Sequence, residues 1–316
     1  MRITVAVCTW NRCHLLKQTL EQMTKLSIPA GVEWELLVVN NNSTDETDEV
    51  IESFAGRLPV RRLFEPKPGK SNALNLAVRE AGGDYIIWTD NDVLVDTEWV
   101  AEYCRAFEQR PEAAVFGGTI EPWFEGTPPA WLRQILPRVI NVYGTPDYGD
   151  EPVPFTKDIY PWGANMAVRA KEQAQFLYDT NLGPRPNSGL RGEEASMVQT
   201  MLAAGVVGWW IPQARVRHYV PKDIQTLEHL RGYYGGYGEY SAQQLPERAG
   251  QELFGKPRWL WRQAVEAELK YRLRRLLGRS PEVWIEDLIT SSHGWGYLRA
   301  YKPLPVKDEG ELLRPS

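Results

Sequence analysis

Hydrophobic residues in the first 115 positions follow two alternating patterns. Continuous apolar runs predict buried strands, and these runs lie at residues 3–8, 35–39, 60–64, 85–88 and 113–120. Between the runs, apolar residues recur every three or four positions, and this spacing predicts helices. Buried strands that alternate with helices are typical of an α/β fold, in which a mostly parallel central sheet is covered by helices on both faces.

Polar residues place several helix boundaries. Ser43 and Glu46 have the spacing of a capping box, which predicts a helix from there to about Gly56. Further helices are expected at about 71–82 and 97–109, between the apolar runs.

The pattern changes after residue 120. Residues 121–160 contain ten prolines and glycines, which predicts a long functional loop. A strand at 163–169, a helix at 193–204 and a strand at 206–218 are expected next, and the chain then becomes mainly helical. We therefore predict a main domain at residues 1–220 and a helical C-terminal extension at residues 221–316.

Composition excludes several classes of protein. The charged fraction of 24% and the aromatic fraction of 11% argue against disorder, and a net charge of -5 argues against a nucleic-acid partner. Three cysteines give no disulfide framework. Because the sequence shows no signal peptide and no run of 18 apolar residues, we expect a cytoplasmic protein.

Two carboxylates follow the strand at 85–88. Asp90 and Asp92 are two residues apart at the carboxyl end of this strand, the edge where ligands bind in open α/β sheets. Two such carboxylates can hold one Mg²⁺ or Mn²⁺ ion together with substrate phosphates. An isolated pair of this kind is more often a solvated turn, so the surrounding segments decide its meaning.

Five short segments, in this order and spacing, make the chain resemble the family 2 glycosyltransferases of the GT-A fold. They extend over about two-thirds of the chain and lie at residues 7–12, 37–45, 69–75, 88–92 and 192–194. The resemblance implies a nucleotide-sugar-binding half at residues 1–115 and an acceptor or catalytic half at residues 116–220. It also implies a nucleotide-diphosphate sugar as the donor.

The resemblance assigns the donor site to polar residues of the first half. It places Thr9 and Arg12 beside the base and the diphosphate, and Lys70 where it can neutralise the phosphates. Asn40 stands where such families usually carry Asp; it keeps an acceptor oxygen but lacks the charge, so UDP is the default and GDP the alternative. The remaining expected donor contacts are Asn11, Asn42, Asn75, Asp90, Asn91, Trp162 and Asn165.

The resemblance also implies a metal site and a catalytic base. Asp90, Asp92 and His218 are the expected ligands of Mn²⁺ or Mg²⁺. Glu194 falls on the usual position of the base that deprotonates the acceptor in an inverting transfer, and Glu193 is the alternative. A helix N-terminus lowers the pKa of a carboxyl group, which conflicts with the needs of a base.

A basic segment lies in the C-terminal extension. Residues 256–279 contain eight Lys and Arg and two Glu, a net charge of +6, with Leu and Trp interleaved. This composition is typical of a helix on an anionic membrane, and equally of a helix packed on its own domain with a solvated basic face. Membrane contact would suit a lipid-linked acceptor, and a saccharide acceptor is the alternative.

The sequence therefore predicts a metal-dependent glycosyltransferase, peripheral to the inner face of the cell membrane or free in the cytoplasm. Two alternatives stay open: a protein that binds nucleotide sugars without turnover, and a nucleotidyltransferase on a similar sheet. A nucleotidyltransferase would need a glycine-rich phosphate loop after the first strand. Residues 8–14 contain no glycine, which argues against this alternative. A homodimer also stays open.

Overall fold

The computed structural model describes residues 1–146, 148–184, 192–244 and 252–302, and these residues belong to two compact units. The first unit comprises residues 1–123 and 143–219, and the second comprises residues 124–142 and 220–316. Residues 124–142, which we expected in the main domain, thus belong to the unit that holds the C-terminal helices.

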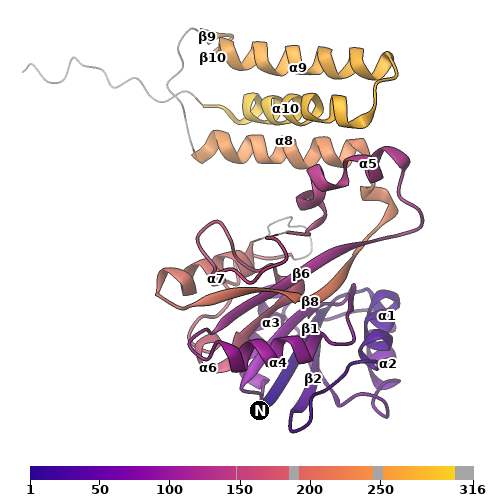
Figure 1. Ribbon diagram of the computed structural model, residues 1–316, viewed down its shortest axis with the longest axis vertical. Helices are drawn as coiled ribbons and strands as arrows, with labels where there is room; N and C mark the ends of the chain where they lie inside the picture. The colour runs from indigo at the N-terminus through magenta and orange to yellow at the C-terminus, as the bar shows by residue number, and fades with distance from the viewer. Residues whose placement is uncertain (147, 185–191, 245–251, 303–316) are drawn as a thin grey trace, which may run out of the picture. The chain divides into compact units, whose positions relative to one another are not determined.

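An eight-stranded sheet forms the centre of the first unit (Figure 1). Its strand order is β3-β2-β1-β4-β7-β6-β8-β5. The strands are β1 (Arg2–Thr9), β2 (Glu33–Asn40), β3 (Val60–Phe64), β4 (Tyr85–Asp90), β5 (Val93–Val95), β6 (Val115–Phe124), β7 (Met166–Arg169) and β8 (Gly208–Val220).

Helices cover both faces of this sheet, as the apolar runs predict. The helices of the unit are α1 (Cys13–Met23), α2 (Thr47–Glu52), α3 (Lys70–Glu80), α4 (Trp99–Gln109), α6 (Ala170–Gln173) and α7 (Glu193–Ala203). Side chains of α1, α2 and α4 pack against one face, where Ile3, Val5 and Val7 of β1 point. Side chains of α3 and α7 pack against the other face with Ala6, because successive strand residues point to opposite sides.

Four neighbouring strands form the parallel part of the sheet. Strand β1 pairs in parallel with both β2 and β4, and β2 pairs in parallel with β3. Beyond β4 the direction changes, because β7 pairs antiparallel with β4 and with β6, and β5 pairs antiparallel with β8. The predicted α/β fold is confirmed, with its parallel strands in the N-terminal half.

Two local predictions are wrong. Helix α2 begins at Thr47, and Ser43 does not cap it, because the Ser43 hydroxyl accepts a hydrogen bond from the backbone N–H of Asn11 at 3.0 Å. Residues 121–160 are not one long loop, since they contain the end of β6, helix α5 (Ala130–Val139) and the 3₁₀ helix η1 (Ile140–Tyr143). Helix α5 tolerates Pro137 near its C-terminal end.

The second unit is mainly helical. Besides α5 and η1 it contains η3 (Lys222–Ile224), α8 (Leu227–Gln244), β9 (Glu252–Leu253), β10 (Lys256–Pro257), α9 (Arg258–Leu276) and α10 (Pro281–Ala300). Helix α10 lies between α8 and α9 (Figure 1). Gly238 allows α8 to approach α10, because a Cβ there would lie 2.0 Å from the carbonyl oxygen of His293. Among the described helices, none has the length and apolar content that a membrane span requires.

Asn165 links four elements of the first unit. Its side chain is fully buried, and its Oδ1 accepts hydrogen bonds from the Trp99 indole and the Tyr103 hydroxyl, both at 2.8 Å. Its Nδ2 donates to the backbone carbonyls of Thr119 at 2.9 Å and Ala214 at 2.7 Å. The amide thus connects the segment before β7 with α4, β6 and β8, and every polar position it has is used.

Replacement of this amide should destabilise the fold. Asn165→Ala leaves two buried donors and two carbonyls without their partner, so we expect unfolding in urea to require about 3 kcal/mol less free energy. Exposed Asn181→Ala is the matched control and should leave the transition unchanged. Equal midpoints for the two variants would show that the network does not stabilise the sheet.

Candidate active site

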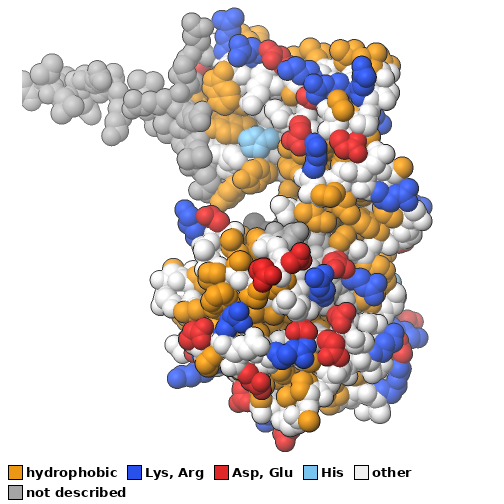
Figure 2. All heavy atoms as spheres, in the orientation of Figure 1, with side chains coloured by type: hydrophobic (Ala, Val, Ile, Leu, Met, Phe, Trp, Pro, Cys, Tyr) orange, Lys and Arg blue, Asp and Glu red, His pale blue; other side chains and the backbone are white. Residues whose placement is uncertain are grey.

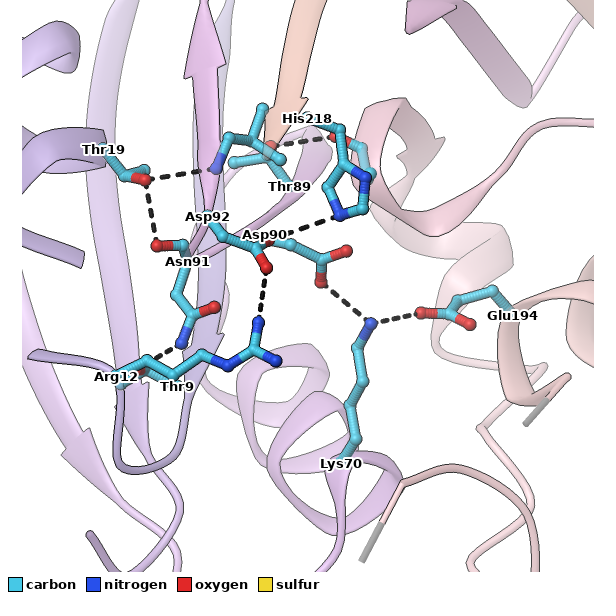
Figure 3. Close-up of polar contacts among 12 residues, drawn as sticks. Thr9, Arg12, Thr19, Lys70, Thr89, Asp90, Asn91, Asp92, Glu194 and His218 are labelled. Atoms are coloured by element: carbon cyan, nitrogen blue, oxygen red, sulfur yellow. Dashed lines mark hydrogen bonds and ion pairs between the residues drawn. The ribbon is translucent and has the colours of Figure 1, made fainter. Parts of the chain in front are cut away.

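Strand register brings the predicted polar residues to one edge of the sheet. Thr9, the last residue of β1, pairs with Asn40 at the end of β2, and Cys8 pairs with Asp90 at the end of β4. The carboxyl ends of three strands therefore meet at one edge of the sheet, and Figure 3 shows the polar side chains that β1 and β4 place there, Thr9 and Asp90 among them.

Asp90, Asp92 and His218 form a group that could hold a metal ion. The antiparallel pairing of β5 with β8 places His218 opposite Val93, and the Tyr219 N–H donates to the Asp92 carbonyl at 2.9 Å. One ligand atom from each residue of the group lies within 4.8 Å of the others. Two carboxylates and an imidazole form a donor set that suits Mn²⁺, and carboxylates suit Mg²⁺.

Neighbouring charges hold Asp92 in its ionised form. Burial alone would raise its pKa, but His218 at 3.5 Å and the Arg12 guanidinium, which forms an ion pair with it, together lower the pKa. The same contact raises the pKa of His218 although burial opposes this. A cation bound here must displace the imidazole proton, so its affinity should fall at low pH.

Lys70 lies among three carboxylates, and Figure 3 shows it between two of them, Asp90 and Glu194. Its Nζ is 2.8 Å from Asp90 Oδ1, 2.7 Å from Glu194 Oε1 and 3.8 Å from Glu193 Oε1. Burial would lower the pKa of this ammonium, but the acids around it raise the pKa well above its ordinary value. The protonated lysine therefore connects Asp90, a member of the candidate metal group, with the acidic pair at the start of α7.

Asn41 fixes the loop that carries Lys70. Its Nδ2 donates to the carbonyls of Glu65 at 3.0 Å and Lys67 at 2.8 Å, and its Oδ1 accepts from the Gly69 N–H at 2.8 Å. Gly69 has φ +129°, which a residue with a side chain rarely adopts. This role was not predicted, and its only signal in the sequence is the position of Asn41 after a predicted strand.

The two glutamates of α7 have different surroundings. Glu193 is almost fully buried, its Oε2 has no hydrogen-bond partner, and burial followed by repulsion from Glu194 raises its pKa to about 7. Glu194 is more exposed; burial would raise its pKa, but the contact with Lys70 outweighs this and lowers it. Gly163 leaves room for Glu194, since a Cβ there would lie 2.4 Å from its Oε1.

The loops after β1 and β2 are connected to each other. The Asn11 side chain accepts a hydrogen bond from the Thr44 N–H at 2.7 Å. Asn11 and Asn42 both have positive φ, at +50° and +63°, a conformation that Asn tolerates better than most residues. These two asparagines therefore shape turns at the edge of the predicted base site.

Other predicted donor contacts are engaged within the protein. Asn40 is buried, donates to Asp48 at 2.7 Å and accepts from the Ser43 N–H at 2.8 Å. Asn75 exchanges two hydrogen bonds of 2.9 Å with the backbone of Tyr178. Asn165 is fully used in the core, so neither its amide nor that of Asn75 enters the donor site proposed here.

The remaining predicted residues stay near the sheet edge. Asn91 is buried and donates to the Thr9 hydroxyl at 2.7 Å, which orients the loop between Asp90 and Asp92. The Arg12 side chain is about half exposed. Trp162 is partly buried, and both its ring and that of His218 lie within 4 Å of the position that a Cβ on Gly144 would take.

Comparison with known proteins identifies the chain as a glycosyltransferase. The family described as glycosyl transferase family 2 matches residues 4–171, which is more than half of the chain. The chain therefore belongs to glycosyl transferase family 2, and the resemblance inferred from its five segments is confirmed.

Known proteins similar to this chain agree with the family. The chain is 24% identical over 255 residues to the succinoglycan biosynthesis protein ExoM of Rhizobium meliloti. The aligned region covers 79% of this chain and 77% of ExoM. It is 22% identical over 261 residues to the glucosyl-dolichyl phosphate glucuronosyltransferase of Haloferax volcanii, and the aligned region covers 76% of each chain.

A solved structure shares the fold. The mannosyltransferase PcManGT of Pyrobaculum calidifontis, in complex with GDP-Man and Mn²⁺, is similar with a TM-score of 0.54 and 18% identity. The similarity covers 95% of this chain and 72% of PcManGT. The GT-A fold is thereby confirmed.

Removal of one metal ligand should abolish cation binding. We expect calorimetric titration of Mn²⁺ into the protein to show one site that is lost in Asp92→Asn and weakened in His218→Ala, because each removes a ligand. Exposed Asp158→Asn should bind as the unaltered chain does. Unchanged binding in Asp92→Asn would place the cation elsewhere.

The buried Glu193 should make stability depend on pH. Its pKa in the folded chain, about 7, lies above the ordinary value of 4.5, so its favourable contribution is complete below pH 4.5 and is lost as the pH rises through 7. The Gln side chain of Glu193→Gln does not ionise. We therefore expect the difference in melting temperature between this variant and the unaltered chain, measured in EDTA, to grow in favour of the variant as the pH rises from 4.5 to 7. A difference independent of pH would contradict this assignment.

Proposed function

We propose that the chain is a metal-dependent, inverting glycosyltransferase in which Glu194 deprotonates the acceptor hydroxyl. The observation that carries this proposal is a juxtaposition at one sheet edge. The metal-binding group of Asp90, Asp92 and His218 lies next to the ion pair between Lys70 and Glu194. A site for the donor diphosphate is thereby adjacent to a carboxylate that can act as a base.

The donor is a nucleotide-diphosphate sugar that binds across the ends of β1, β2 and β4. Lys70 and Arg12 supply positive charge to its phosphates, and Asp90, Asp92 and His218 would hold Mn²⁺ or Mg²⁺. When bound, the cation would stabilise negative charge on the leaving diphosphate. UDP is the default nucleotide; GDP is the alternative because Asn40 has no carboxylate and because the fold neighbour PcManGT holds GDP-Man and Mn²⁺.

Accessibility favours Glu194 over Glu193 as the base. The side chain of Glu194 is 15% exposed, whereas that of Glu193 is 3% exposed. An acceptor hydroxyl must come within hydrogen-bond distance of the base, and the more exposed carboxylate is easier for it to reach. Glu193 then serves as a buried neighbour that positions Lys70.

Lys70 could change partners when the donor binds. Without donor, its ammonium forms an ion pair with Glu194 and lowers the pKa of that carboxyl group. The donor diphosphate would attract the ammonium more strongly than the Glu194 carboxylate does, so donor binding would weaken the ion pair between Lys70 and Glu194. The pKa of Glu194 would then rise, which makes it a better base. The acceptor oxygen then attacks the anomeric carbon as Glu194 takes its proton, and the bond from that carbon to the diphosphate breaks.

The acceptor class is a saccharide or lipid-linked hydroxyl. A saccharide is consistent with the relative named for succinoglycan biosynthesis, and a lipid-linked acceptor with the relative named for glucosyl-dolichyl phosphate. A lipid-linked acceptor would place the reaction at the inner face of the cell membrane.

Loss of the base should remove turnover and leave donor binding intact. With Mn²⁺ and a panel of UDP- and GDP-sugars, we expect the unaltered chain to release nucleoside diphosphate and EDTA to stop it. Glu194→Gln should lower this rate by roughly 10²–10⁴-fold, the usual contribution of a general base. Its melting temperature should still rise with donor and Mn²⁺.

Glu193→Gln is the matched control, since it changes the neighbouring carboxylate in the same way. It should lower the rate much less than Glu194→Gln does, because Glu193 acts on the donor only through Lys70, and a larger loss in Glu193→Gln than in Glu194→Gln would exchange the two roles. A chain that is stabilised by the donor but never releases nucleoside diphosphate would be a binding protein.

A further inference from the structure

Helix α9 has two apolar faces, and its own unit uses only one of them. The buried face consists of Leu260, Ala264, Ala267 and Tyr271. A second set of apolar residues recurs at spacings of four and three residues and is 40%, 61%, 56% and 85% exposed: Val265, Leu269, Leu273 and Leu276, here called the leucine stripe. At 3.6 residues per turn, the stripe lies opposite the buried face.

Basic side chains flank the leucine stripe. The side chains of Arg262 and Arg272 are 77% and 73% exposed, and helical geometry places both on the outer half of α9 with the stripe. Each has one glutamate on the same helix, at 3.7 Å and 2.7 Å, so the surplus of positive charge in this segment remains. Figure 2 shows Lys and Arg side chains among hydrophobic ones along the edge where α9 lies.

This combination identifies the class of surface that would cover the stripe. A nucleic acid would contact the arginines but leave four large apolar side chains in water. A bilayer with anionic headgroups engages both, because the apolar side chains enter the boundary between headgroups and acyl chains while the guanidinium groups reach the phosphates. Charge complementarity therefore favours anionic lipid over a neutral surface.

We propose that α9 lies in the plane of an anionic lipid bilayer, with the leucine stripe inserted and its flanking basic side chains on the headgroups. This contact uses no residue of the donor site and needs neither donor nor metal. It goes beyond the proposed reaction, and it can be tested separately from that reaction.

The test is cosedimentation of the full chain with vesicles, without donor or cation. We expect binding to vesicles of phosphatidylcholine with phosphatidylglycerol, weaker binding at high salt, and none to phosphatidylcholine alone. The variant L269S/L273S/L276S should bind at least roughly tenfold more weakly. The same holds for R262Q/K270Q/R272Q, which replaces the two arginines and the exposed Lys270 of the same helix. The matched controls F64S/L177S/V207S and K17Q/K25Q/K171Q change exposed residues elsewhere and should bind as the unaltered chain does.

Three outcomes would overturn the proposal. The first is failure of the unaltered chain to bind anionic vesicles, and the second is undiminished binding in both α9 variants. The third is a dimer in solution that L269S/L273S/L276S converts to a monomer while vesicle binding stays unchanged, because the stripe would then be an interface between two copies. Circular dichroism of each variant shows that the compared chains are folded, and the charge variant replaces none of the apolar residues of α9.

Discussion

The rest of the site depends on the ion pairs between the Lys70 ammonium and the carboxylates around it. Asp90, Glu193 and Glu194 converge at one sheet edge, and like charges in a partly buried place repel each other unless a cation lies among them. Lys70 also begins α3, and its backbone N–H donates to the Pro184 carbonyl at 3.0 Å. One residue thus joins the sheet edge to the acidic pair of α7.

The two halves of the sheet contribute different parts of the site. The parallel half ends in the loops that carry Arg12, Asp90 and Asp92, because parallel strands all finish at the same edge. The antiparallel half returns the chain to this edge and supplies His218 from β8. Asp90, Asp92 and His218 therefore come together only where the two halves meet, and their geometry depends on the short β5–β8 pairing.

Asparagine side chains hold much of this edge together. The amides of Asn11, Asn41 and Asn75 each bond to backbone groups of another segment, which satisfies polar groups that loops would otherwise leave unpaired. An amide has both donors and an acceptor, so it can serve such a network or a bound nucleotide equally well. This is why residue type alone did not separate Asn165, a core residue, from Asn91, which lies between Asp90 and Asp92 at the sheet edge.

The sequence by itself determined the α/β class, the order of strands and helices in the first half, and the family. Those features depend on local hydrophobic periods and on short motifs, which neighbouring residues specify. Tertiary structure alone decided that β7, β6, β8 and β5 complete the sheet, that residues 124–142 join the helical unit, and that Lys70 faces Glu194. These outcomes depend on pairings between residues far apart in the chain, where register and packing, rather than local preference, set which side chains meet.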